Sequence, residues 1–267
     1  MWFATVSVLL YLVSILLIAP LLVKAHSSGK IEKSKQNVFF LTALFAIFCH
    51  LVSLHTLINH LLSGQSFTLM DVGSLLSVII AGLATAAMMF RVNTLWVLLP
   101  IVYCFAIINL ILQALLPGSI VQHLAQNTGL LIHIALALFA YALCFIATLY
   151  AIQLRWIDYQ LKSKKMAFSP LIPPLMTVER HFFRLLLTGE VLLTFTLISG
   201  AIYLADFFAS QNIQKAWLSL LAWMIFGVAL LGHWKWYWRG KKMIIYTISG
   251  MILLTIAYFG SRVMFSV

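Results

Sequence analysis

Long apolar runs alternate with short polar connections along the whole chain. Eight of these runs are long enough for a membrane-spanning helix, which needs about 20 apolar residues. No run shows the apolar–polar alternation typical of a membrane β-barrel. The sequence therefore predicts an all-α fold, a polytopic transmembrane helical bundle that forms a single membrane domain over residues 1–267, with helices at about 2–23, 38–60, 70–89, 94–116, 128–152, 182–205, 216–233 and 243–264.

Basic residues are distributed unevenly between the connections. The first, third, fifth and seventh connections carry 15 of the 17 lysines and arginines. Cytoplasmic loops of membrane proteins are enriched in these residues. The distribution predicts that both termini lie outside the cytoplasm. The longest polar stretch is 153–181, where we expect the fifth helix to continue to about Lys165 and to stop before Pro170.

The composition agrees with a membrane protein. The chain is 63% hydrophobic and 9% charged, whereas soluble domains are about 25% charged. The net charge of +11 could suggest a nucleic-acid-binding surface, but the placement of the basic residues in alternate connections explains it. We therefore expect a lipid bilayer and no nucleic acid as partner.

Few residues could carry out acid–base or nucleophilic chemistry. Glu190 is the one carboxyl residue well inside a predicted helix, and the simplest interpretation is a protonated, hydrogen-bonded group. No nucleophile with a base and an orienting acid can be assembled, and the three cysteines form no CxxC pair. The sequence therefore favours a protein that is not an enzyme.

Histidine is unusually abundant, with eight residues against six carboxylates. His50, His133 and His233 lie within three different predicted helices, near mid-membrane, near the outer end and at the inner end. Haem iron takes histidine as an axial ligand. Two histidines that bind the iron from the two faces of the macrocycle come from different helices. These three residues are thus candidate haem-iron ligands, with His50 and His233 as the candidate pair and His133 at an outer site. The alternative is that they are packing residues that hydrogen-bond between helices.

Tryptophan, tyrosine and basic residues are concentrated between His233 and Gly240. This pattern is typical of the aromatic belt at a membrane–water interface. A platform for haem is the alternative interpretation.

Several segments resemble the cytochrome c assembly membrane proteins, the CcsA, CcmC and HemX group. The segment from Leu131 to Ala142 is similar to the family's histidine-bearing helix, and Gly232-His233 with Trp238-Arg239-Gly240 is similar to the helix that ends in histidine. Leu98 to Tyr103 and Trp156 to Lys162 resemble the short YpjD-type branch of that family.

The resemblance implies a bundle in the bacterial inner membrane that binds haem. Carried over by position, His133 matches the outer axial histidine and His233 the membrane histidine. The family's tryptophan-rich signature would fall in the loop 204–214, which here contains no tryptophan.

We therefore expect a haem-handling protein of the CcsA type without full haem lyase activity. Haem is its expected cofactor, and other membrane or cytochrome assembly proteins are its expected partners. The alternatives are an accessory or regulatory membrane subunit with structural histidines and a small-solute permease, for which Glu190 is the sole binding-site signature.

Overall fold

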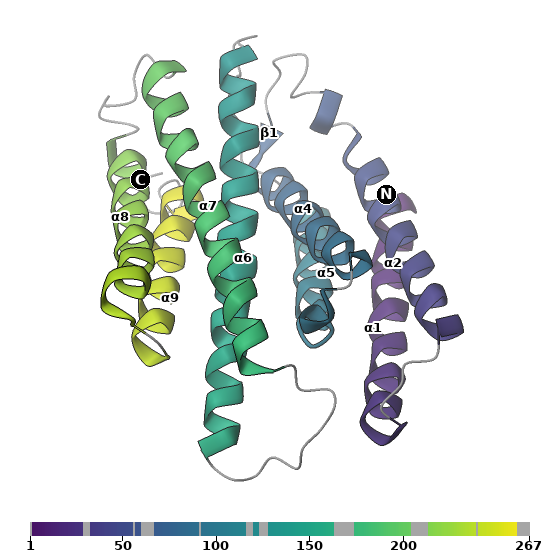
Figure 1. Cartoon of the computed structure of the whole chain (residues 1–267). Coiled ribbons are helices and arrows are strands. Elements are labelled where there is room, and N and C mark those ends of the chain that lie inside the picture. The colour runs from purple at the N-terminus through teal and green to yellow at the C-terminus, as the bar shows by residue number, and fades with distance from the viewer. Residues whose placement is uncertain are drawn as a thin grey trace. The chain divides into compact units, whose positions relative to one another are not determined.

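The computed structural model confirms a polytopic helical bundle. It describes residues 2–28, 33–55, 57–59, 67–90, 92–115, 120–122, 128–162, 174–203, 213–238 and 240–260. Within these residues, seven helices are long and apolar enough to cross a membrane, and an eighth, α5, is shorter at 17 residues. Figure 1 shows the long helices that make up the chain.

The chain divides into two compact units of four helices each. The first unit comprises Met1–Gln126 and Met166–Pro174, and the second comprises Asn127–Lys165 and Leu175–Val267. Whether the two units act as the single membrane domain expected from the sequence stays a prediction.

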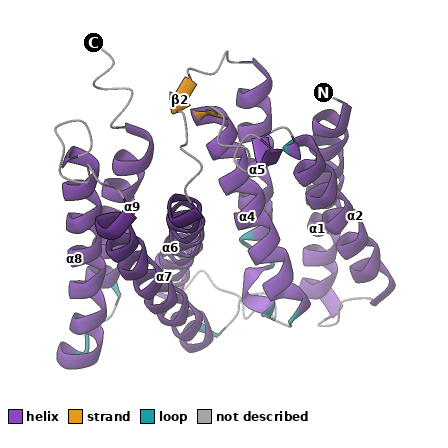
Figure 2. Cartoon of the chain, turned by 90° about the horizontal axis from the view of Figure 1, so that it is seen from above, coloured by secondary structure: helices purple, strands orange, loops and turns teal. Residues whose placement is uncertain are grey.

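The first unit contains α1 (Trp2–Ser28), α2 (Lys33–Ser53), α4 (Leu69–Met89) and α5 (Leu99–Leu115). Each of these helices packs against the next along the chain, and α5 packs against α1, so the four close into a ring (Figure 2). Its core consists of large aromatic and aliphatic side chains from all four helices, including the fully buried Tyr11, Phe39, Leu76 and Tyr103.

The end of this unit at which α4 begins is closed by local polar contacts. Strand β1 (Phe67–Thr68) pairs antiparallel with β2 (Ile120–Gln122). Thr68 then caps α4 in a capping box with Asp71, which satisfies backbone donors at a helix start. Gln113 Nε2 donates to Asp71 Oδ1 at 2.7 Å, so α5 is tied to the start of α4.

The second unit contains α6 (Thr128–Lys162), α7 (Leu175–Tyr203), α8 (Ile213–Trp236) and α9 (Lys241–Thr255), and a short π-helical segment, Ile256–Gly260, follows α9. These helices also close into a ring in chain order, because α9 packs against α6. Helices α6 and α7 approach closely: a Cβ at Gly129 would lie 2.7 Å from Tyr203 Cγ, and one at Gly189 would lie 2.8 Å from Cys144 Sγ.

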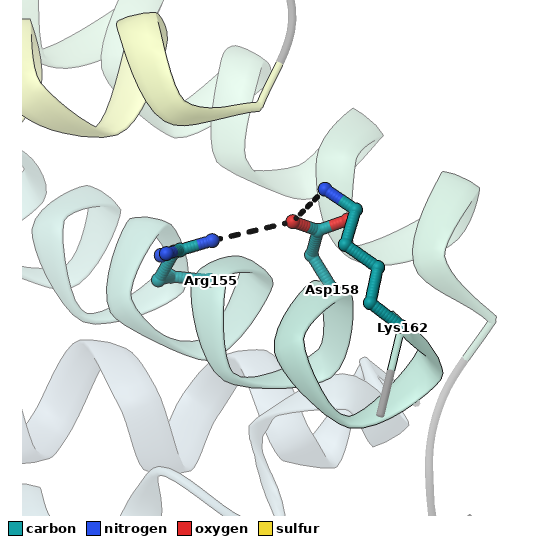
Figure 3. Close-up of polar contacts among 3 residues, drawn as sticks. All are labelled: Arg155, Asp158 and Lys162. Atoms are coloured by element: carbon teal, nitrogen blue, oxygen red, sulfur yellow. Dashed lines mark hydrogen bonds and ion pairs between the residues drawn. The ribbon is translucent and has the colours of Figure 1, made fainter. Parts of the chain in front are cut away.

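The predicted continuation of the fifth helix is confirmed as far as Lys162, and residues 163–165 lie outside the described residues. Helix α6 has 35 residues, or about 52 Å at 1.5 Å per residue, whereas the hydrocarbon core is about 30 Å thick. On its last turns Asp158 Oδ2 accepts from Lys162 Nζ at 2.9 Å and from Arg155 Nη1 at 3.4 Å (Figure 3). These exposed ion pairs are typical of a helix end in water and add little to stability.

Several predicted helix boundaries differ from the structure. Helix α1 ends at Ser28 rather than 23, and α2 runs over Lys33–Ser53 rather than 38–60. Helix α7 begins at Leu175 rather than 182, directly after Pro174, because charged residues do not stop a helix that enters water. Helix α5 begins at Leu99 rather than 94, after a 3₁₀ turn over Asn93–Leu95. The reason is Pro100, which is tolerated in the first turn of a helix and disrupts the interior. Pro170 and Pro173 lie outside the described residues.

Candidate histidine sites

His50 lies in the core of the first unit, where it links three helices. Its side chain is fully buried. Its Nδ1 lies 3.3 Å from Tyr11 Oη on α1, and its Nε2 lies 3.0 Å from Ser74 Oγ on α4. Both ring nitrogens therefore have hydrogen-bond partners, and a bond from His50 to iron would require one of them to be given up.

His133 lies near the start of α6, against the last part of α7. Its Nδ1 is 3.1 Å from the Thr196 carbonyl oxygen and 3.0 Å from Ser199 Oγ. A carbonyl can only accept a hydrogen bond, so Nδ1 carries the proton and Nε2 carries the lone pair. In the described part of the chain Nε2 has no hydrogen-bond partner. Metal-ligating histidines have this arrangement, with one nitrogen held by an oxygen and the other free to ligate.

His233 lies near the end of α8 and is held in the same way. Its Nδ1 is 3.4 Å from the Trp238 carbonyl oxygen. The ring of Phe183, on α7, stacks on the imidazole with a centroid separation of 3.4 Å and an interplanar angle of 19°. Among the residues that the structure describes, none hydrogen-bonds to Nε2. His233 therefore has the nitrogen arrangement that a metal-ligating histidine requires.

The turn after α8 brings the Trp238 carbonyl to His233. Tyr237 has a positive φ of 51°, a left-handed conformation that is uncommon for residues other than glycine. The chain then folds back, and the Trp238 N–H donates to the Gly232 carbonyl at 3.0 Å. The indole of Trp238 covers Gly232, where a Cβ would lie 2.7 Å from Trp238 Cδ2.

An aromatic stack extends from this turn. Trp238 stacks on Trp236 and on Tyr246, each with a centroid separation of 5.4 Å. The Lys242 ammonium lies 5.2 Å from the centre of the Trp238 ring. Trp236 and Tyr237 are exposed, as expected for an interfacial belt. The segment thus has the composition of a belt and also positions a candidate ligand.

His133 and His233 contact opposite halves of α7. His133 meets it at Thr196 and His233 at Phe183, and this separation of 13 residues corresponds to about 20 Å along a helix. Metal–nitrogen bonds are about 2 Å long. The two histidines therefore could not ligate the same metal ion. The predicted pairing of His50 with His233 would join the two units and stays a prediction.

The remaining histidines add no site in the part of the chain that is described. His55 is exposed just after α2, and the ring of His181 lies 6.3 Å from that of Tyr150. The side chains of His26, His60 and His123 lie outside the described residues. No group of three or more His, Cys, Asp or Glu residues that could hold a metal ion occurs in the described segments.

Sequence comparison places the chain in a known family. The sequence profile described as "Cytochrome C assembly protein" matches residues 2–267. The chain belongs to the cytochrome c assembly protein family. It is 42% identical over 262 residues to "Inner membrane protein YpjD" of Escherichia coli K12, a match that covers 98% of this chain and 97% of that protein. The YpjD proteins of E. coli O6:H1 and O157:H7 match equally well.

No solved structure matches the chain. Membership of the cytochrome c assembly protein family confirms the resemblance inferred from the sequence, including the YpjD-type branch. The partners Tyr11, Ser74, Ser199, Phe183 and the Trp238 carbonyl were not foreseen. Of these, Trp238 alone had a signal in the sequence, since it lies in the aromatic segment after His233.

Proposed function

We propose that the chain is a haem-binding protein of the bacterial inner membrane that binds or passes haem and lacks full haem lyase activity. The observation that carries this proposal is the geometry of His233, whose Nδ1 is held by a carbonyl and whose Nε2 has no partner in the described residues. Membership of the cytochrome c assembly family supports it. The inner-membrane location follows the name of the YpjD relatives.

Each residue around His233 has a defined role in this proposal. When bound, haem supplies a redox-active iron in a flat, mostly apolar macrocycle. His233 would hold this group through the lone pair of Nε2. The Trp238 carbonyl holds the proton on Nδ1, and the stacked Phe183 ring fixes the imidazole plane. His133 contacts the other half of α7 with the same arrangement, in which a carbonyl holds Nδ1, and is proposed as the ligand of an outer site.

The roles proposed here need neither a nucleophile nor a general base. The protein binds, orients and releases the cofactor, and the chemistry belongs to the cofactor. Other membrane or cytochrome assembly proteins are its proposed partners, and both termini are proposed to lie outside the cytoplasm.

The rival proposal is an accessory or regulatory membrane subunit whose histidines are packing residues. His50 favours it, because both of its ring nitrogens are hydrogen-bonded within a fully buried cluster. Leaving one partner unsatisfied in such a cluster costs about 1–3 kcal/mol. On this proposal His→Ala substitutions reduce stability and yield and affect nothing else.

The absorption spectrum of the purified protein separates the two proposals. We expect a Soret band after haem-replete expression, and we expect His233→Ala to change its intensity or spin state while the protein still accumulates. His133→Ala tests the outer site in the same way, and His50→Ala should mainly lower the yield. The matched control is His55→Ala, at an exposed histidine, which should leave spectrum and yield unchanged. A colourless wild-type protein would support the accessory subunit instead.

A further inference from the structure

Glu190 is a carboxyl residue in the interior of the second unit that the proposed function does not use. It lies near the middle of α7, which runs from Leu175 to Tyr203, so it is about 20 Å from either end of that helix. Its side chain is only 8% exposed. The residue therefore lies where water does not readily reach a charged group.

The carboxyl group has one oxygen against α8 and one without a partner. Its Oε1 lies over Gly227, where a Cβ would be 3.4 Å away, and its buried Oε2 accepts and donates no hydrogen bond in the described part of the chain. One turn earlier on α8, Trp223 Nε1 donates to Thr194 Oγ1 at 2.8 Å. The indole N–H is thus used by the threonine and does not neutralise the carboxyl group.

No basic side chain in the described segments forms an ion pair with Glu190. The ion pairs found in the described residues involve Asp158 and not Glu190. On α7 the nearest basic residue is Arg184, six positions or about 9 Å away. The titratable residue of α6 beside this position is Cys144, which contacts Gly189, while α8 presents Trp223 and Gly227, which do not titrate. An unpaired carboxylate in an apolar interior is strongly disfavoured relative to the neutral acid.

We propose that Glu190 is a proton-binding site in the membrane interior. Its carboxyl group carries an exchangeable proton and is the neutral acid in the resting protein. This assignment rests on the burial, the unpartnered oxygen and the position facing Gly227, and it is independent of haem binding.

A hydrophobic carbodiimide tests the proposal on the full chain in membranes. The acid O–H adds across a C=N bond of the reagent: the carboxylate oxygen bonds to the central carbon, the proton moves to nitrogen, and no redox change occurs. We expect the adduct on Glu190 and not on Glu179, a carboxyl residue near the start of the same helix. A water-soluble carbodiimide should show the opposite preference. Peptide mass spectrometry measures both, and E190Q should lose the adduct.

The comparison of Glu190 with Glu179 is made within the wild-type protein, so it holds even if E190Q folds poorly. Absence of a Glu190 adduct, or equal labelling of both residues by the hydrophobic reagent, overturns the proposal. Infrared spectroscopy provides a second measurement. We expect a carbonyl band of a protonated carboxylic acid that is missing in E190Q and that shifts in D₂O. A band that is absent, or that does not shift, excludes an exchangeable proton on Glu190.

Discussion

Replacing Gly232 by alanine should displace Trp238 and with it the carbonyl that holds His233. The new methyl group would lie 2.7 Å from Trp238 Cδ2 and 3.0 Å from Cζ3, whereas carbon atoms pack at about 3.5–4.0 Å. The indole cannot move away freely, because it is stacked on Trp236 and Tyr246 and its backbone N–H bonds to Gly232. The ring must therefore shift by about 1 Å.

The expected loss of stability follows from two opposing effects. Overpacking of this kind costs about 1–3 kcal/mol, and replacing a helical glycine by alanine gains about 0.5–1 kcal/mol. We expect a net loss of about 1–2 kcal/mol. The matched control is Gly82→Ala in α4, where a Cβ would meet no atom within 4 Å, so it should gain about 0.5–1 kcal/mol.

Thermal unfolding of the two variants in detergent measures this difference. Gly232→Ala should unfold at a lower temperature than the wild type, and Gly82→Ala at an equal or higher temperature. In haem-loaded protein, Gly232→Ala should also alter the Soret band, because His233 loses the acceptor on its Nδ1. If Gly232→Ala were as stable as Gly82→Ala, the packing of Trp238 on Gly232 would be disproved.

Three further predictions concern topology, activity and the turn after α8. Expressed as the only assembly factor, the protein should yield no covalent cytochrome c, and restored holocytochrome would contradict the proposed lack of lyase activity. Tyr237→Gly should be about 1 kcal/mol more stable than Tyr237→Ala in thermal unfolding, because glycine adopts the positive φ without steric cost; equal stability would show that the left-handed backbone costs nothing. Fusions of topology reporters test whether both termini lie outside the cytoplasm. We expect an outside signal at Gly64, Gly118 and Ser210 and an inside signal at Lys33 and Lys164. An inside signal at Gly118 would overturn this orientation.

The helices could be predicted from the sequence because lipid imposes a simple rule. Every backbone polar group must be satisfied within the span, so a long apolar run indicates a helix. This rule located α4 to within one residue of its observed start. It could not locate the start of α7 at Leu175, where water replaces lipid and polarity no longer marks a boundary. The β1–β2 pair, of two and three residues, is too short to show any periodicity.

The candidate site residues could be predicted only as residue types at approximate depths. The difference between His50 and His233 depends on what each ring nitrogen meets. His50 meets two hydroxyl groups from other helices, whereas His233 meets a carbonyl five residues further along its own chain. That carbonyl is in reach because Tyr237 adopts a left-handed conformation, and a tyrosine gives no sequence signal for such a turn.

The ring order of the helices has a consequence for biosynthesis. In each unit a helix packs against the one made just before it, and the contact between the last helix and the first completes the ring. As the ribosome elongates the chain, each new segment that leaves the translocon thus finds its neighbour already in the bilayer. The α1–α5 and α6–α9 contacts join the first and fourth helices of a unit, so they form last, after the fourth helix has been synthesised. Short sequence separation favours rapid association, so we expect the nascent chain to assemble as helical hairpins during insertion.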